Sequence, residues 1–205
     1  MYPVITISRE FGSGGHSIGE KVAKELNIPF YDGEIVNRVA IESGYAKELI
    51  EEQGEHTNVS DKWFSISSAS TMYFQSPQDE IFLAQRNVIL DCAAKGPCVI
   101  VGRCSDYILK NEDIPAIHVL IHADMPHRIK RVSERYGEIE DISVKKRIQK
   151  KDKQRRTYYR YYTDQHWGDY ENYDLALDSG TLGENICVAC ICETVKHYAM
   201  EQEGK

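Results

Sequence analysis

Residues 4–17 read VITISREFGSGGHS, and this stretch decides the fold. Its first four residues are all β-branched, which is typical of a short buried strand. A glycine-rich turn at 12–15 follows, and apolar residues then recur at helical spacing from Ile18 to Leu26. Glycines let consecutive backbone N–H groups point inward, and such a loop in front of a helix binds anions. The stretch therefore predicts a strand, a phosphate loop and a helix.

The loop departs from the usual phosphate-loop pattern G-x-x-x-x-G-K-[ST]. When residues 15–17 are aligned with its last three positions, Glu10 replaces the first glycine and His16 replaces the lysine. A shift by one residue puts Gly15 at the lysine instead. Neither register keeps an ammonium group, and histidine is shorter than lysine and mostly neutral at pH 7. We expect Arg9 or an arginine that closes over the loop to supply the charge, with Ser17 as a Mg²⁺ ligand.

Two other interpretations of the loop stay open. A dinucleotide site needs G-x-G-x-x-G, and Asp32 stands about where a ribose-binding acid would, but Ser17 occupies the third glycine position. The loop also fits a plain tight turn that holds a strand against a helix. The strand before it and the basic segment described below favour phosphate binding.

Composition bounds the class of protein. The chain has 205 residues, a net charge of −7 and 41% hydrophobic residues, which is ordinary for one globular domain. No apolar run approaches the roughly 20 residues of a membrane span. Six cysteines without a secretion signal indicate reduced thiols and a cytoplasmic protein. The acidic balance argues against nucleic acid or anionic membranes as partners of the whole surface.

One segment, residues 145–160, is strongly basic although the chain as a whole is acidic. It holds nine lysines and arginines against Asp152 alone, so it carries +8 and the rest of the chain −15. Cations at helical spacing repel one another unless a ligand neutralises them, which favours a phosphate-rich ligand over a solvated helix face. Tyrosines alternate with arginine at 158–162, so a single-stranded RNA site is the rival interpretation.

Short apolar strands alternate with helices along the rest of the chain. Strands are expected at 29–31, 98–101, 117–121 and 173–177, and helices at 34–43, 46–55, 78–95, 125–136, 144–162 and 186–200. This alternation predicts a parallel sheet with helices on both faces. The three cysteines at 187–192 extend the apolar set of the last helix, which favours core packing over a metal site.

Four segments together resemble the cytidylate kinase-like family, a branch of the P-loop nucleoside monophosphate kinases. They are PVITISREFGSGGHSIG at 3–19, FYDGEIVNR at 30–38, VIVGRCSDYIL at 99–109 and KKDKQRRTYYRYYTDQHWGDYENYDLALDS at 150–179. The resemblance implies a three-layer α/β P-loop kinase fold: a parallel five-stranded sheet of order 2-3-1-4-5, helices on both faces and a helical lid. It implies one domain over 1–205, with an acceptor-binding insert at about 33–95 and a lid at about 133–170.

The resemblance also implies ATP-dependent phosphoryl transfer to a small molecule, with a nucleoside monophosphate as leading acceptor and ATP and Mg²⁺ as cofactors. The donor would be held by Gly12, Ser13, Gly14, Gly15, His16 and Ser17, and Mg²⁺ by the Ser17 hydroxyl. Substrate-binding positions would be Asp32, Arg38, Arg103 and Asp106. The arginines expected to act on the transferring group are Arg103, Arg128, Arg131, Arg155, Arg156 and Arg160.

The sequence departs from the family at the acceptor site. Cys104 follows Gly-Arg where authentic cytidylate kinases carry aspartate, and Arg155 falls where they carry a second aspartate; Asp106 is the candidate substitute. We therefore expect phosphoryl transfer to be retained more readily than a preference for cytosine. A catalytically weak nucleotide-binding regulatory protein and an RNA-binding module remain the alternatives, and a homodimer stays open.

Overall fold

The computed structural model describes residues 2–42, 77–137 and 142–204 of the chain. Within these ranges five parallel strands form one sheet in the order β2-β3-β1-β4-β5. The strands are β1 (Val4–Arg9), β2 (Phe30–Tyr31), β3 (Val99–Val101), β4 (Ala116–His122) and β5 (Leu175–Asp178). The predicted order 2-3-1-4-5 is confirmed.

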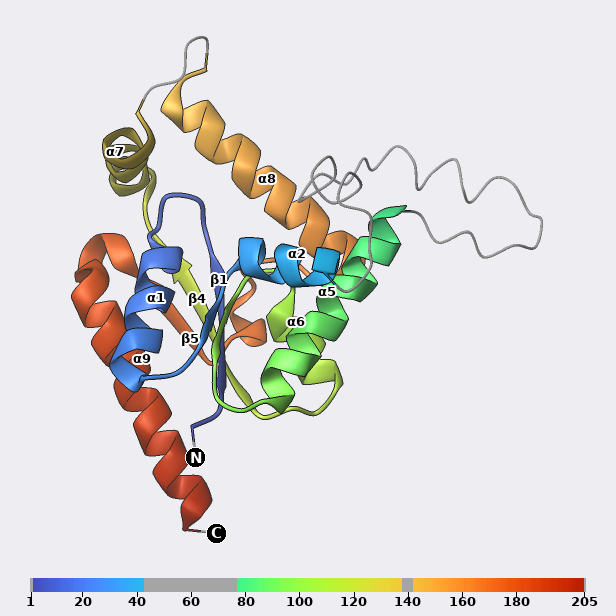
Figure 1. The fold of residues 1–205 in the computed structure, drawn as a ribbon. Coiled ribbons are helices and arrows are strands. Elements are labelled where there is room, and N and C mark those ends of the chain that lie inside the picture. Colours follow the sequence, from blue (N-terminus) through green and yellow to red (C-terminus); the bar gives the residue numbers. More distant parts are fainter. Residues whose placement is uncertain (1, 43–76, 138–141, 205) are drawn as a thin grey trace, which may run out of the picture.

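Helices cover both faces of this sheet (Figure 1). The described helices are α1 (Gly15–Leu26), α2 (Gly33–Glu42), α5 (Pro77–Ala94), α6 (Ser105–Asn111), α7 (Met125–Tyr136), α8 (Val144–Thr163) and α9 (Ser179–Glu203), with a 3-10 turn at Tyr170–Asn172. Helices α1 and α9 pack on one face, and α5 and α6 on the other. The predicted three-layer arrangement is confirmed. None of the described helices is long and apolar enough to cross a membrane.

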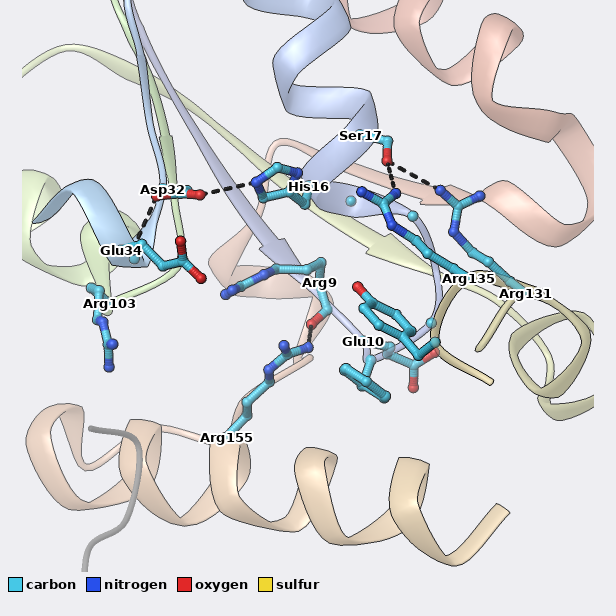
Figure 2. A pocket seen from close by; sticks show the side chains of 16 residues that line it. Arg9, Glu10, His16, Ser17, Asp32, Glu34, Arg103, Arg131, Arg135 and Arg155 are labelled. Carbon is cyan, nitrogen blue, oxygen red and sulfur yellow. Dashed lines mark hydrogen bonds and ion pairs between the residues drawn. The ribbon is translucent and has the colours of Figure 1, made fainter. Parts of the chain in front are cut away.

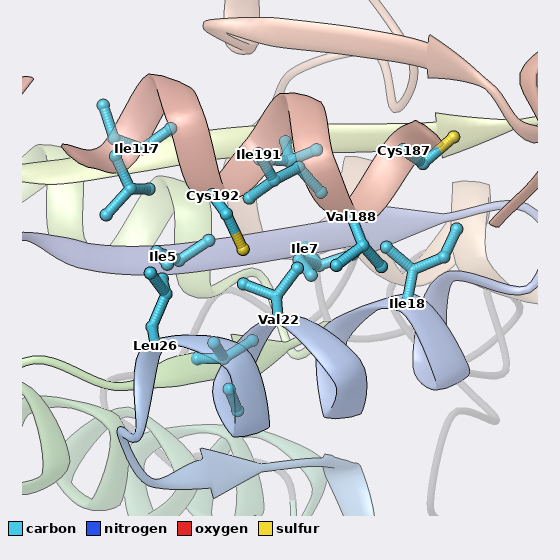
Figure 3. Packing of buried hydrophobic residues seen from close by; sticks show 14 of the residues in the cluster. Ile5, Ile7, Ile18, Val22, Leu26, Ile117, Cys187, Val188, Ile191 and Cys192 are labelled. Carbon is cyan, nitrogen blue, oxygen red and sulfur yellow. The ribbon is translucent and has the colours of Figure 1, made fainter. Parts of the chain in front are cut away.

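Side chains of the central strand, β1, point alternately to the two faces of the sheet and join a hydrophobic core on each face. Ile5 and Ile7 of β1 pack with Ile18 of α1 and Ile191 of α9 (Figure 3), whereas Val4 packs in the cluster under α5 and α6. Successive side chains of a strand point to opposite faces, so a strand covered on both sides is buried at successive positions, which in β1 include the polar Thr6 and Ser8. Burying each of the apolar side chains contributes about 1.5–3 kcal/mol.

The strand register places two turns at one edge of the sheet. Ile7 pairs with Val101 and Arg9 with Ile121, so β1, β3 and β4 end at this edge. The phosphate loop (residues 10–17) follows β1, and the Gly-Arg turn follows β3. Ligands of open parallel sheets bind beyond the carboxyl ends of the strands, so this edge is where a site is expected.

Helix α8 passes over this edge and is anchored at its C-terminal end (Figure 1). Tyr158 and Tyr159 are buried, and the ring of Tyr162 stacks on Phe82 of α5 with ring centroids 4.0 Å apart. A helix that the resemblance assigns to a lid is therefore fixed to the core over its last two turns.

Two elements differ from the sequence prediction. Helix α6 was not predicted; it has seven residues and starts directly after Arg103 and Cys104, whose φ angles are +57° and +53°. Helix α9 begins at Ser179 rather than at 186, because the Asp178 side chain accepts hydrogen bonds from its first turn, although Gly183 breaks the helical geometry. The helix predicted at 46–55 lies outside the described residues.

Candidate functional site

The phosphate loop contains two glycines in the left-handed region. Gly12 has a φ of +87° and Gly14 a φ of +85°. A Cβ on Gly12 would lie 2.9 Å from Cγ2 of Val132, and one on Gly14 would lie 2.9 Å from Cζ of Arg131. The backbone angles favour glycine at both positions, and the close approach of α7 also excludes a Cβ at Gly12.

Ser13 anchors the loop to the sheet. Its N–H donates to the Glu10 carbonyl at 3.2 Å, its buried hydroxyl lies 3.0 Å from the Ile121 carbonyl, and its own carbonyl accepts from Ser179 at 2.5 Å. Helix α1 then starts at Gly15 with no side-chain cap and no acidic residue in its first turn. The first N–H groups of a helix lack intrahelical acceptors and carry partial positive charge, so this end suits an anion.

A cleft of about 400 Å³ lies in front of the loop (Figure 2). It is lined by the loop, by Asp32, Gly33 and Glu34, by Tyr136, and by the arginines Arg9, Arg103, Arg131, Arg135 and Arg155. These arginines come from β1, from the turn after β3, from α7 and from α8. Guanidinium groups that converge from several elements on an uncapped helix N-terminus can attract an anion, and in this cleft they outnumber the carboxylates of Glu10, Asp32 and Glu34.

The ring of His16 points toward Asp32 and not along the loop. Its Nε2 lies 3.0 Å from Oδ2 of Asp32, while Oδ1 of Asp32 accepts hydrogen bonds from the N–H groups of Glu34 and Ile35 at 3.0 and 2.9 Å. Burial raises the pKa of Asp32, but the hydrogen bonds from Ile35, His16 and Glu34 outweigh burial and lower it overall. Asp32 therefore stays ionised, holds His16 and starts α2.

Ser17 faces α7 instead of the centre of the loop. Its Oγ accepts hydrogen bonds from Nη1 of Arg135 at 2.6 Å and from Nη2 of Arg131 at 3.2 Å. Arg131 also forms an ion pair with Glu184 of α9, which binds Lys21 of α1 at 2.6 Å. Two guanidinium groups thus occupy the neighbourhood of the hydroxyl that was expected to bind Mg²⁺.

Arg128 has a different environment, although it is three residues before Arg131 on the same helix. Its side chain is 4% exposed and forms ion pairs with Glu10 and Asp152. Asp152 also accepts from the N–H of Phe11 at 2.8 Å. Arg128 does not line the cleft; it joins the loop to α7 and α8 through charges that are already paired.

Arg103 lies at the opposite end of the cleft from α7. It is 9% exposed, and its Nε and Nη1 have no hydrogen-bond partner among the described residues. Its Nη2 lies near Asn37 of α2, whose side-chain oxygen accepts from it at 3.0 Å when the amide is oriented to satisfy both groups. Buried donors without partners are costly, so this guanidinium is suited to receive an anionic ligand.

The arginines of α8 divide between two sides of the helix. Arg155 lines the cleft and donates from Nη1 to the Arg9 carbonyl at 2.8 Å. Arg156 and Arg160 line a separate groove with Lys153 on the other side of α8. The structure therefore does not bring all three predicted lid arginines together.

Asp106 is buried and does not line the cleft. Its Oδ2 accepts a hydrogen bond from the Tyr159 hydroxyl at 2.9 Å, and its Oδ1 has no partner among the described residues. Burial raises its pKa to about 6, although the bond from Tyr159 acts in the opposite direction. The predicted substrate position Asp106 thus connects α6 to α8. The side chain of Arg38, also predicted to bind substrate, lies outside the described part of the structure.

Sequence reasoning missed several residues of this cleft. Arg135, Tyr136 and Glu34 line it, and Glu184 reaches it through Arg131. Arg135 could have been found, because it lies four residues after Arg131 on the predicted helix at 125–136. Glu184 left no such signal, because its contact depends on how α9 packs beside α1.

Fold and site together define a P-loop kinase architecture. The structure overlaps a shikimate kinase from Bacteroides thetaiotaomicron with a TM-score of 0.57 and 12% identity, covering 96% of this chain and 99% of that one. A gluconokinase from Sinorhizobium meliloti gives 0.56 and 15%, covering 97% of each chain. At these identities the likeness concerns the fold alone.

The chain belongs to the cytidylate kinase-like family, whose model matches residues 4–181. It is 30% identical over 95 residues to a cytidylate kinase from Methanococcus vannielii, covering 46% of this chain and 54% of that protein. The chain therefore matches about half the length of this curated relative. A structure of an uncharacterized protein from Eubacterium ventriosum is 28% identical with a TM-score of 0.71, covering 95% and 98% of the two chains.

Proposed function

We propose that the protein transfers a phosphoryl group from ATP to a nucleoside monophosphate. One observation carries the proposal: five arginines from four parts of the fold line the same cleft as the uncapped N-terminus of α1. Phosphoryl transfer needs positioning and charge neutralisation far more than covalent chemistry, and this arrangement offers both. The family supports a nucleotide kinase, and the acceptor is the inferred part.

The residues present fit ATP and Mg²⁺ at the loop. Gly12 and Gly14 give the loop its left-handed backbone angles, and the N–H groups that open α1 would hold a phosphate. ATP supplies the phosphoryl group, and Mg²⁺ would be held in part by the Ser17 hydroxyl once that oxygen is released from Arg131 and Arg135. Arg155 lies on α8 across the cleft, where its guanidinium would neutralise charge on the transferred group.

The acceptor end of the cleft is built around Arg103. Its two unpartnered nitrogens would bind the phosphate of a nucleoside monophosphate, a group that a guanidinium can grip with two hydrogen bonds. Asp32 would keep the start of α2 in place beside it through its bonds to Glu34 and Ile35. Cys104 occupies the family's aspartate position and is buried, so we propose no preference for cytosine.

A coupled assay of ADP release tests this function. Wild-type protein with ATP and Mg²⁺ is offered CMP, dCMP, UMP, AMP and GMP, and turnover with at least one of them is expected. Arg103→Gln should raise the KM for the acceptor roughly tenfold or more and leave the Kd for ATP unchanged, because the charge-assisted hydrogen bonds to the acceptor phosphate are lost. Thermal melts of both proteins check that the variant is folded.

Two outcomes contradict the proposal. ATP binding by calorimetry without turnover of any monophosphate would make the protein a nucleotide-binding regulator. Salt-sensitive RNA binding that survives Gly14→Val would favour the RNA-binding alternative. The structure offers that alternative little support, since Tyr158 and Tyr159 are buried and unable to stack on bases.

A further inference from the structure

The phosphate loop lacks the lysine that would ordinarily neutralise the charge of a bound phosphate. The position next to Ser17 is His16, and its ring is engaged by Asp32, on the side of the cleft away from α7 (Figure 2). A triphosphate brings several negative charges to the loop, and the N–H groups of α1 offer only partial positive charge. A full positive charge close to Gly14 and Ser17 is needed from elsewhere in the fold.

Helix α7 places such a charge against the loop. The Arg131 guanidinium lies so close to Gly14 that a Cβ there would be 2.9 Å from Cζ and 3.1 Å from both terminal nitrogens. Its Nη2 is 3.2 Å from the Ser17 hydroxyl, and Arg135 reaches the same oxygen at 2.6 Å. Arg131 and Arg135 lie one helical turn apart, so one helix face presents both groups to the loop.

Glu184 of α9 holds Arg131 in this position. Its Oε1 pairs with Nη2 of Arg131, and its Oε2 lies 2.6 Å from Nζ of Lys21. Burial raises the pKa of Glu184, but Lys21 and Arg131 outweigh burial and lower it overall, so the carboxylate stays charged. The three side chains come from α1, α7 and α9, and together they fix the guanidinium relative to the N-terminus of α1.

We propose that Arg131, assisted by Arg135, replaces the lysine that the phosphate loop lacks, and that Glu184 is the positioning residue for Arg131. The inference rests on the proposed function, because it concerns how the donor phosphates are held. When a phosphate enters, its oxygens replace the Ser17 hydroxyl as acceptors of the two guanidinium groups, while Glu184 keeps its contact with Arg131. No covalent step is involved.

The test removes the positive charge of Arg131 and introduces a positive charge at position 16 of the loop. Calorimetry measures the Kd for ATP in the presence of Mg²⁺ for wild type, Arg131→Gln, His16→Lys and the double variant. Arg131→Gln should weaken ATP about 10- to 100-fold, which is the usual contribution of a hydrogen bond to a charged group. A lysine at position 16 stands where the ordinary loop pattern has one, so His16→Lys should recover most of that loss in the double variant.

Two matched controls isolate the charge and its place. Lys130→Gln removes an exposed cation from the same helix without touching the loop, and ATP affinity should stay within about twofold of wild type. His16→Gln combined with Arg131→Gln introduces a neutral side chain at position 16 and should give no recovery. Recovery by lysine alone then assigns the effect to positive charge at the loop.

The role of Glu184 is tested by comparing the KM for ATP with kcat and with the KM for the acceptor. Glu184→Gln should raise the KM for ATP severalfold with kcat and the acceptor KM nearly unchanged, and the effect should shrink in the His16→Lys background. A purely structural role would instead lower the melting temperature and affect both substrates equally. Glu184→Asp, which keeps the charge, should recover part of the affinity.

The outcomes separate this inference from the proposed function. If wild-type protein fails to bind ATP, the proposed function fails and the inference fails with it. If wild type binds ATP and Arg131→Gln binds equally well, the inference alone is wrong. It is also wrong if the loss in Arg131→Gln is the same with histidine and with lysine at position 16.

Discussion

Helices α7 and α8 are both basic, but they use their charge differently. Helix α8 contains the nine cations of residues 145–160, and of these only Arg155 lines the cleft. Helix α7 has fewer cations and places both Arg131 and Arg135 there. The density of positive charge along a helix therefore does not identify the helix with the most arginines in the cleft, because only residues on the face turned toward the cleft can line it.

The buried contacts of each helix explain this difference. On α8, Ile148, Asp152 and Tyr159 are buried at successive separations of four and seven residues, and Arg155 falls on the same side. Arg156 lies one position on and faces the separate groove. On α7, Arg128 and Val132 are buried, so Arg131 and Arg135 are left beside the cleft at the edge of that buried face.

The largest effect on the free energy of unfolding is expected at Arg128, which connects α7 to α8 through Asp152. Arg128→Gln leaves Glu10 and Asp152 without their shared partner, and breaking a buried ion pair costs about 3–5 kcal/mol of unfolding free energy. Urea unfolding measures the loss. Arg131→Gln, whose partly exposed pair with Glu184 is worth about 1 kcal/mol or less, is the matched comparison on the same helix. Equal losses in the two variants would contradict the distinction between structural and ligand-facing arginines.

A smaller effect, dependent on pH, is expected at the anchored end of α8. The pKa of Asp106 rises from 3.8 to about 6 in the folded protein, so between these values the folded state binds more protons than the unfolded state. The unfolding free energy should therefore decrease as pH rises from about 4 to 6, by about 3 kcal/mol in total. Asp106→Asn should lack this decrease in urea unfolding at pH 4, 5, 6 and 7; parallel curves for variant and wild type would disprove it.

The smallest effect separates the two sides of α8. Arg155→Gln should lower kcat roughly tenfold, because Arg155 lines the cleft, whereas Arg156→Gln should lower it less. Lys150→Gln, which removes an exposed cation of the same helix, is the control for general loss of charge. Steady-state kinetics of ADP release measures all three. A larger loss in Arg156→Gln would show that α8 rotates or closes when ligand binds.

Much of the fold was predictable from the chain. The runs at 98–101 and 117–121, apolar apart from His118, were predicted as strands because burial on both faces favours apolar sequence. Helix α6 was missed because seven residues are too few to show a helical period, and α9 was predicted to start late because its first turn is held by the Asp178 cap. The roles expected of Arg128 and Asp106 came from the family resemblance, and in the structure both side chains are buried and have partners within the protein.

By itself the sequence determined the strand, loop and helix at 4–26, because glycine freedom and apolar periodicity are local properties that neighbours along the chain express directly. It also determined that the loop has histidine where the ordinary pattern has lysine. Only the tertiary structure decided which guanidinium groups face the loop, because that depends on how α7, α8 and α9 pack around α1. Glu184 meets Arg131 across a separation of 53 residues, and no local pattern encodes such a contact.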